Sequence, residues 1–285
     1  MKYNATEILT LLEQGYYHTT ANQRVDFSQM HRDAIAHTKL YTPENLKIMR
    51  DAIISTSSHC ESRISLDISV VAGTTQKIAH QLCREQSSPN LLLLNFASAR
   101  NPGGGFLNGA RAQEEDLCRC SGLYPTLLTQ PHYYQVNREQ SSMIYTDHTI
   151  YSPHVPFLKI ASKKELLDQP FMASVVTMPA PNTGPFLQRK EGSTQDLETA
   201  FLRRWRNVIA IAHAHQHTCV LLGAWGCGAF QGDAHLVASM AKKAITQGTG
   251  CIEKIVFAIP DKGKVSKHNF SVFYEYLHKF NMGAG

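Results

Sequence analysis

The sequence predicts an α/β fold, arranged as a three-layer α/β/α sandwich. Apolar runs of strand length alternate with segments of helical periodicity along most of the chain after residue 60. The run Val220, Leu221 and Leu222 is continuously apolar, which suits a strand covered on both faces. In such a sandwich, ligands bind beyond the carboxyl ends of the strands.

The expected elements follow in order from these patterns. The first 60 residues favour an N-terminal helical extension, in which Ile8, Leu9, Leu11 and Leu12 form one apolar face, and Ile35, Leu40 and Leu46 indicate further short helices. Residues 61–285 form the main domain. Its strands are expected at 65–71, 91–96, 173–178, 219–223 and 252–259, and its helices at 74–86, 194–213, 235–246 and 266–280.

The middle of the chain is less regular. Glycines and polar residues predict a loop at 101–110, and a helical stretch follows that we expect to break at Pro125 and to end before Pro131. Between 133 and 170 only short strands, near 143–145 and 155–160, are predicted.

Composition excludes several classes of protein. The 285 residues are 43% hydrophobic and 18% charged, which excludes wholesale disorder, fibres and coiled coils. The net charge of +5 fits a polyanionic ligand, but the cations are scattered, so no nucleic-acid groove is predicted. Seven cysteines, an odd number, favour reduced thiols. No signal core or membrane-length apolar run is present, so we expect a cytoplasmic protein without a membrane partner; export by a route that needs no signal stays open.

One segment combines glycines with acidic residues. Gly103, Gly104 and Gly105 follow the expected strand at 91–96, and Gln113-Glu114-Glu115 follows at the start of the next helix. Glycines let a backbone approach a ligand where a Cβ would clash. Adjacent helical residues point about 100° apart, so the two carboxylates should have different roles. The alternatives are a mobile surface loop and acids that merely stabilise a helix start.

A second glycine-rich loop spans Gly223 to Asp233, again after an apolar strand and before a helix. Its N–H groups are suited to cradle a diphosphate at the helix N-terminus. It matches neither a Walker loop nor the dinucleotide fingerprint. Phe230 is expected to stack on a sugar or to pack in the core, and Cys227 reads as a buried thiol rather than a nucleophile. Asn182, in the Pro-rich segment after the strand at 173–178, is a cleft residue or part of a plain turn.

Neither a metal nor a cofactor is predicted. Cys118 and Cys120 are too closely spaced for a usual zinc pair, and no second cysteine pair completes them. His213 and His217 lie four residues apart at a helix end, where solvated histidines are common.

The two glycine loops and the segment Gln113-Glu114-Glu115 together resemble a known family. Gly103-Gly104-Gly105 with Gln113-Glu114-Glu115 resembles the signature of poly(ADP-ribose) glycohydrolases, and residues 95–102 and 117–124 resemble its microbial type. Residues 180–182 and 223–230 are similar in order and spacing, so the resemblance covers roughly residues 60 to 260.

This resemblance implies a macrodomain-like fold with a mixed sheet that binds ADP-ribose between the two glycine loops. It implies that Glu115 is the catalytic acid/base and that Glu114 helps to hold the ribose. Residues 223–230 would bind the diphosphate, with Phe230 positioning the distal ribose. The expected substrate-binding residues are Asn101, Gly103, Gly104, Gly105, Gln113, Asn182, Gly223, Gly226, Cys227, Gly228, Ala229 and Phe230.

The implied reaction is cleavage of ribose–ribose O-glycosidic bonds, with poly(ADP-ribose) or ADP-ribosylated protein as substrate and ADP-ribose as product. Two alternatives stay open: a mono-ADP-ribosyl hydrolase acting on modified protein or nucleic acid, and a non-catalytic ADP-ribose reader. The intact pair Glu114-Glu115 argues against the reader.

Overall fold

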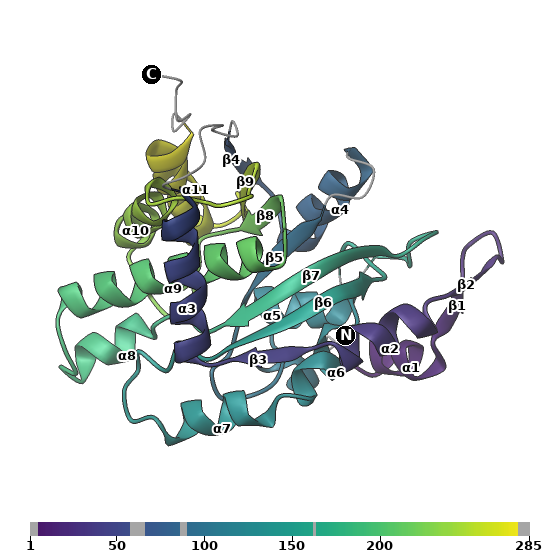
Figure 1. Cartoon of the computed structure of the whole chain (residues 1–285). Coiled ribbons are helices and arrows are strands. Elements are labelled where there is room, and N and C mark those ends of the chain that lie inside the picture. The colour runs from purple at the N-terminus through teal and green to yellow at the C-terminus, as the bar shows by residue number, and fades with distance from the viewer. Residues whose placement is uncertain (1–4, 58–65, 86–89, 162–163, 279–285) are drawn as a thin grey trace.

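A mixed seven-stranded sheet lies between two layers of helices, which confirms the predicted sandwich (Figure 1). The computed structural model describes residues 5–57, 66–85, 90–161 and 164–278. The strands are β1 (Tyr16–His18), β2 (Arg24–Asp26), β3 (Lys39–Tyr41), β4 (Asp67–Ala72), β5 (Leu91–Phe96), β6 (Thr149–Phe157), β7 (Phe171–Met178), β8 (Cys219–Leu222) and β9 (Lys254–Ile259). The helices are α1 (Thr6–Gln14), α2 (Ser28–Ala36), α3 (Pro43–Ser57), α4 (Thr75–Glu85), α5 (Gln113–Cys120), α6 (Leu123–Leu128), α7 (Pro131–Glu139), α8 (Thr183–Gln188), α9 (Thr194–Ala214), α10 (Ala234–Thr246), α11 (Lys264–Leu277) and the short 3₁₀ helix η1 (Phe106–Asn108).

Most of the main sheet is parallel. Its strand order is β3-β6-β7-β5-β8-β9-β4. The strands from β7 to β4 pair in parallel, whereas β6 is antiparallel to β7 and to β3. The carboxyl ends of the five parallel strands therefore meet at one side, here called the carboxyl edge. Their starts meet at the opposite side, the amino edge.

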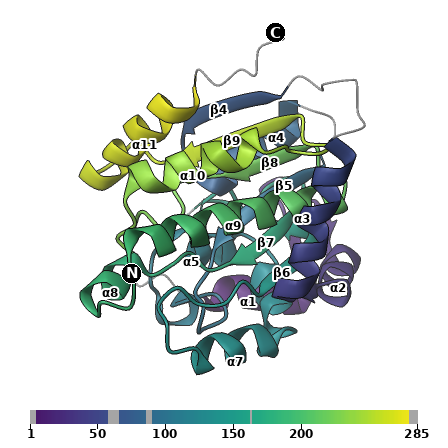
Figure 2. The ribbon, with the colours of Figure 1, turned by 60° about the vertical axis from the view of Figure 1, so that its left-hand side comes forward.

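Alternate side chains of the central strand serve the two helical layers. Leu92 and Leu94 of β5 belong to the core beneath α3, α9, α10 and α11, the layer in front of the sheet in Figure 2. Leu91 and Leu93 belong to the second core, with α1, α4, α5 and α6. All four leucines are almost fully buried, as expected of a strand covered on both faces.

The regular elements of the main domain agree with the sequence prediction to within about three residues, and β5 has the predicted bounds. Residue 65 and residues 279–280, which we expected in a strand and a helix, lie outside the described residues. The domain division at residue 60 stays a prediction. The first 60 residues nevertheless contribute β3 to the main sheet, so Leu40 lies in a strand and not in the short helix that we expected.

Two expectations for the middle of the chain are wrong. The helical break falls at Ser121 and Gly122, with Pro125 inside the first turn of α6. Proline is tolerated in the first turn because the N–H groups there have no intrahelical acceptor. Residues 143–145 form no strand. The helical stretch does end before Pro131, since α6 ends at Leu128, and the first half of the second predicted strand, residues 155–157, lies within the longer β6.

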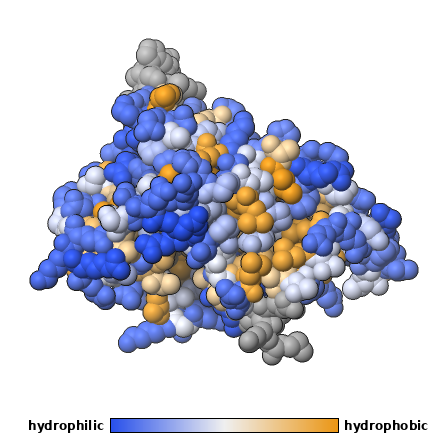
Figure 3. All heavy atoms as spheres, turned by 90° about the horizontal axis from the view of Figure 1, so that it is seen from below, coloured by the Kyte–Doolittle hydropathy of each residue, from blue (hydrophilic) through white to orange (hydrophobic). Residues whose placement is uncertain are grey.

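The face seen from below in Figure 3 is mostly hydrophilic, with several apolar patches among charged and polar residues. In the described part of the chain, no helix has the length and apolar character needed to cross a membrane. The six cysteines described there are free thiols.

Candidate active site

Three loops meet at the carboxyl edge of the sheet. They follow β5, β7 and β8, which are neighbours because β5 lies between the other two. Gly223 after β8 lies so close to β5 that a Cβ there would be 2.9 Å from Cζ of Phe96. The N–H of Gly184, which follows the β7 loop, donates to the carbonyl of Phe230 at 3.1 Å. The structure thus brings the two glycine loops and the Asn182 segment to one place.

The two glutamates occupy the first turn of α5 but have different partners. Glu114 accepts hydrogen bonds from the N–H of Ser98 at 2.7 Å and from the side-chain amide of Asn95 at 3.1 Å. Glu115 Oε1 accepts from the N–H of Gly105 at 2.8 Å. This fits the expectation that adjacent helical carboxylates serve different roles.

Gly104 lies against both carboxylates. Its φ of +59° is in the left-handed region, and a Cβ there would lie 2.5 Å from Glu115 Oε1 and 3.1 Å from Glu114 Oε2. A side chain at this position would displace the pair, so the backbone geometry requires glycine.

Burial makes this pair unlike acids that merely stabilise a helix start. Glu114 is 2% exposed and Glu115 is 7% exposed. Burial, reinforced by the adjacent Glu115 charge and opposed by the hydrogen bonds from Ser98 and Asn95, raises the pKa of Glu114 to about 8. Glu114 therefore holds its proton in most molecules at neutral pH, which relieves repulsion within the pair.

Glu115 keeps one oxygen unused. Its Oε2 atom is buried and has no hydrogen-bond partner among the described residues. Buried polar atoms in native proteins are nearly always hydrogen-bonded, so an exception requires an explanation, and a catalytic role is one such explanation. This oxygen is suited to exchange a proton with a substrate.

The loop that faces Glu115 is held in place and is not a mobile surface loop. The buried guanidinium of Arg119 donates to the carbonyls of Ala110 at 2.6 Å and of Phe106 at 3.4 Å. Asn101 contributes its backbone, because its carbonyl accepts from the N–H of Gly104 at 2.9 Å, while its side chain is exposed. Gly103, with a φ of +66°, packs beside Tyr124.

Gln113 fastens α5 to the central strand. Its side-chain oxygen accepts from the N–H of Phe96 at 2.8 Å, and its amide donates to the carbonyl of Leu94 at 2.8 Å and to Thr75 at 3.1 Å. This geometry favours a positioning role over the direct substrate contact that the sequence suggested.

The second glycine loop presents a row of unused donors. The N–H groups of Gly228, Ala229 and Phe230 donate to no acceptor among the described residues. Successive free N–H groups form an anion-binding concavity. The start of α10 does not contribute, because the side chain of Asp233 already accepts from the N–H groups of His235 at 2.7 Å and Leu236 at 3.2 Å. The unused N–H donors therefore belong to the loop itself and not to the N-terminus of α10, where we expected a diphosphate to bind.

The second glycine loop is held in place by contacts with the β7 loop and with α11. Gly226 has a φ of +79° and lies beside Ala180 of the β7 loop. Asn269 of α11 donates to the carbonyl of Cys227 at 3.3 Å. Burial raises the pKa of the Cys227 thiol to about 12, so this cysteine is a packing residue and not a nucleophile.

The chain matches one family in sequence. The family model described as "Microbial-type PARG, catalytic domain" matches residues 5–160, more than half of the chain. The chain belongs to the microbial-type PARG family. No curated protein sequence matches the chain.

Solved PARG structures share the whole fold. The poly(ADP-ribose) glycohydrolase of Thermomonospora curvata is 31% identical, with a TM-score of 0.86 over 95% of this chain and 97% of that one. The same enzyme bound to the inhibitor ADP-HPD is 32% identical, with a TM-score of 0.82 over the same shares. The poly(ADP-ribose) glycohydrolase of Deinococcus radiodurans in complex with ADP-ribose is 35% identical, with a TM-score of 0.77 over 86% of this chain and 96% of that one.

A third segment, which contains Tyr145, lies beside the second glycine loop, and the sequence did not reveal it. Tyr145, before β6, has a φ of +62°, and its ring centroid lies 6.4 Å from that of Phe230. Its hydroxyl lies 3.5 Å from the side-chain amide of Asn182. The fully buried Arg204 of α9 fixes this segment by donating to the carbonyls of Ile144 at 2.6 Å, Tyr145 at 3.1 Å and Thr146 at 3.0 Å.

Of the residues that sequence reasoning missed, only one carried a signal. Asn95 is a polar residue inside an apolar strand, and such a buried side chain requires a specific partner, here Glu114. Ser98, Arg119, Tyr145 and Arg204 act through contacts with other segments of the chain, which no local pattern encodes.

The candidate metal ligands do not converge in this PARG fold. The side chain of His213 faces Cys251, whereas His217 bonds to Tyr151 and Asn90. Across residues 5–57, 66–85, 90–161 and 164–278, no three histidine, cysteine or acidic side chains are grouped to hold a metal ion.

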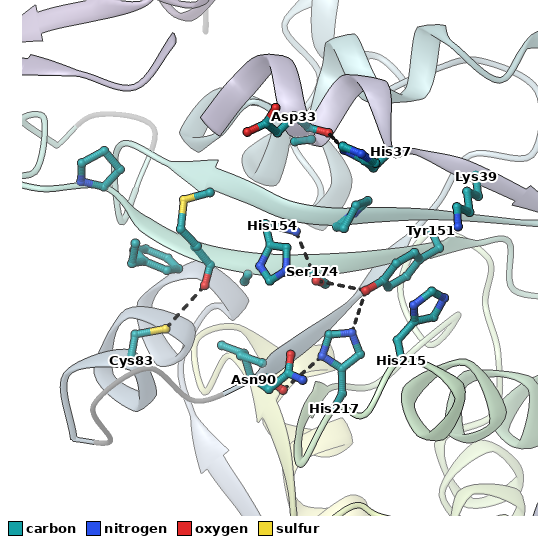
Figure 4. Close-up of a pocket in the computed structure, with 17 residues that line it drawn as sticks. Asp33, His37, Lys39, Cys83, Asn90, Tyr151, His154, Ser174, His215 and His217 are labelled. Carbon is teal, nitrogen blue, oxygen red and sulfur yellow. Dashed lines mark hydrogen bonds between the residues drawn. The ribbon is translucent and has the colours of Figure 1, made fainter. Parts of the chain in front are cut away.

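A hollow of about 850 Å³ lies at the amino edge, away from the glycine loops (Figure 4). Several of its polar side chains are bonded within the protein. His217 bonds to the Tyr151 hydroxyl at 2.9 Å and to the Asn90 carbonyl at 3.1 Å, and His215 bonds at 2.7 Å to Tyr41, which lies outside the lining. Burial lowers the pKa of His217 to about 4, so its ring is neutral. None of the predicted site residues lines this hollow.

Proposed function

We propose that this chain hydrolyses the ribose–ribose O-glycosidic bonds of poly(ADP-ribose) and releases ADP-ribose. The observation that carries the proposal is the unused Oε2 of Glu115, which lies at the same edge as three unused N–H groups. The names of the related bacterial enzymes and the ADP-ribose complex of the Deinococcus radiodurans protein support it.

The cleft supplies a separate group for each part of the ligand. The diphosphate is anionic and suits the N–H groups of Gly228, Ala229 and Phe230. Phe230, partly exposed, would lie beside the distal ribose. Glu114, held by Ser98 and Asn95, would contact the ribose hydroxyls through its remaining lone pairs.

One carboxylate can carry out both proton transfers. Protonated Glu115 would give its proton to the departing ribose oxygen as the glycosidic bond breaks, and the bound diphosphate would stabilise the positive charge that develops on the remaining ribose. Ionised Glu115 would then take a proton from the water that attacks the anomeric carbon, which returns the acid to its starting state.

The test compares wild type with Glu115→Gln. Glutamine keeps an acceptor for the Gly105 N–H but cannot donate an acidic proton. We expect ADP-ribose release from purified poly(ADP-ribose) to fall about 1,000-fold, while the Kd for ADP-ribose, measured by calorimetry, changes by less than about threefold. Glu13→Gln, on the exposed side of α1, is the matched control and should behave as wild type.

Each other outcome points to a defined alternative. Near-normal release by Glu115→Gln would refute the role of Glu115. Binding without release by the wild type would indicate the reader, and release only from mono-modified protein would indicate the mono-ADP-ribosyl hydrolase. We also propose a reducing, intracellular location, which the free thiols support.

A further inference from the structure

Two exposed arginines lie on neighbouring segments near the glycine loops. Arg100 follows β5 and belongs to the loop whose glycines face Glu115, and Arg138 lies in the last turn of α7. A side-chain N–H of Arg138 donates to the backbone carbonyl of Arg100 at 2.8 Å. This bond joins two segments that are 38 residues apart and places the Arg138 guanidinium beside the backbone of Arg100.

The position of this pair relative to the cleft is defined by aromatic contacts. The guanidinium carbon of Arg100 lies 6.0 Å from the ring centroid of Tyr145. Tyr145 in turn faces Phe230 of the second glycine loop. The exposed side chain of Arg100 therefore lies near Tyr145, which contacts the second glycine loop.

Neither guanidinium of this pair is neutralised. Within the described part of the chain, Arg100 and Arg138 form no ion pair with a carboxylate, whereas other surface cations such as Arg24 and Lys47 do. Two adjacent uncompensated positive charges at the mouth of a cleft attract an anion, and a planar guanidinium binds phosphate oxygens in a bidentate manner.

The proposed substrate has an anion to place there. The inference rests on the proposed function, because in poly(ADP-ribose) the leaving group is a ribose hydroxyl of the neighbouring unit, which carries its own adenine and diphosphate. That unit must lie outside the cleft, next to Glu115. The diphosphate of the bound unit is already accounted for by the N–H groups of the second glycine loop.

We propose that Arg100 and Arg138 form a subsite for the diphosphate of the departing ADP-ribosyl unit. The subsite selects a polymer over an ADP-ribosyl group attached to an uncharged partner. It binds only the departing ADP-ribosyl unit and is separate from the site that holds the bound unit, which is released as ADP-ribose.

The test uses the double variant Arg100→Ala/Arg138→Ala and two substrates. One substrate is purified poly(ADP-ribose), and the other is ADP-ribose joined through its distal anomeric carbon to an uncharged nitrophenol. We expect kcat/KM on the polymer to fall about tenfold, since two charge-assisted contacts to an exposed phosphate are lost. Activity on the nitrophenyl substrate and the Kd for ADP-ribose should stay within about twofold of wild type.

Two further measurements separate this subsite from a general charge effect. Arg24→Ala/Arg32→Ala also removes two positive charges, but from exposed positions in the N-terminal region, and should leave polymer cleavage unchanged. Added salt should weaken polymer binding by the wild type more than by the Arg100→Ala/Arg138→Ala variant, because salt screens exposed charges.

The outcomes are distinct for the subsite and for the proposed function. A polymer kcat/KM equal to that of wild type would overturn the subsite, and so would equal losses on both substrates accompanied by weaker ADP-ribose binding. A wild type that hydrolyses neither substrate would instead refute the proposed function, and the subsite with it.

Discussion

The two edges of the sheet differ in whether their central polar groups have partners within the protein. At the amino edge, a hollow of about 850 Å³ is lined by Tyr151, His215 and His217, which are all bonded within the protein. At the carboxyl edge, Glu115 Oε2 and the N–H groups of Gly228 to Phe230 have no partners among the described residues.

This difference shows what marks a binding site in this fold. Volume alone does not, because donors and acceptors that are already paired, such as those of His217 and Tyr151, gain little from a polar ligand. A buried oxygen without a partner, such as Glu115 Oε2, carries an energetic cost in the free protein that a complementary ligand removes. The carboxyl edge is therefore the part of the molecule that is organised for a ligand.

The strongest test of this contrast is Gly104→Ala. The added methyl would meet both carboxylates and would require a side chain at a φ of +59°, so the pair must move. Misplacement of a catalytic group by about 1 Å costs on the order of 100-fold in rate, and we expect that loss in ADP-ribose release. The matched control is His154→Ala in the amino-edge hollow, where the same assay should show wild-type activity.

Either of two results would break the comparison. Full activity in Gly104→Ala would mean that the close approach to the carboxylates has no function. A large loss in His154→Ala, at unchanged thermal stability, would mean that the amino edge participates in the reaction.

Gly228→Ala sharpens the comparison within the carboxyl edge. A Cβ at Gly228 would meet no protein atom within 4 Å, so the free protein should be as stable as wild type. A methyl group there would hold a diphosphate away from the neighbouring N–H groups. We expect the Kd for ADP-ribose to rise about tenfold, which corresponds to the loss of one hydrogen bond to a charged group. Calorimetry of ADP-ribose binding measures this, and an unchanged Kd would place the diphosphate elsewhere.

Local patterns predicted the parts of the fold and site that local physics determines. The apolar run Leu91–Phe96 has the length and composition of a buried strand. Because β5 and β8 pair in parallel, the loops that follow them lie at the same edge of the sheet. Local patterns alone left other interpretations open for the loop at 101–110 and for Glu114 and Glu115, and it was the resemblance to poly(ADP-ribose) glycohydrolases that joined them into one predicted site.

Contacts between distant segments explain the rest. The three residues of β3 form a strand because β6 pairs with them, although Leu40 taken alone suggested a helix. Tyr145 reaches the cleft because the buried Arg204, 59 residues away, binds its carbonyl. Proline also gave one wrong boundary, since Pro125 lies in the first turn of α6, where proline is tolerated, and not at a helix break.

The smallest expected effect concerns the pH dependence of stability, and it tests the state of the carboxylate pair directly. The pKa of Glu114 is raised by burial from its ordinary value of 4.5 to about 8, so the folded protein keeps a proton that the unfolded chain loses between those pH values. The free energy of unfolding must then fall as pH rises from 4.5 to 8. In Glu114→Gln this decline should disappear, because the amide does not titrate. Asn95 donates to Glu114 through its amide nitrogen, so the Asn95 amide must flip for its partnerless Oδ1 to accept the new N–H. Between pH 5 and 8, calorimetry should show the wild-type Tm falling by roughly 5 °C more than that of the variant. Glu13→Gln should follow the wild type, and parallel curves for wild type and Glu114→Gln would show that Glu114 is already ionised at pH 5.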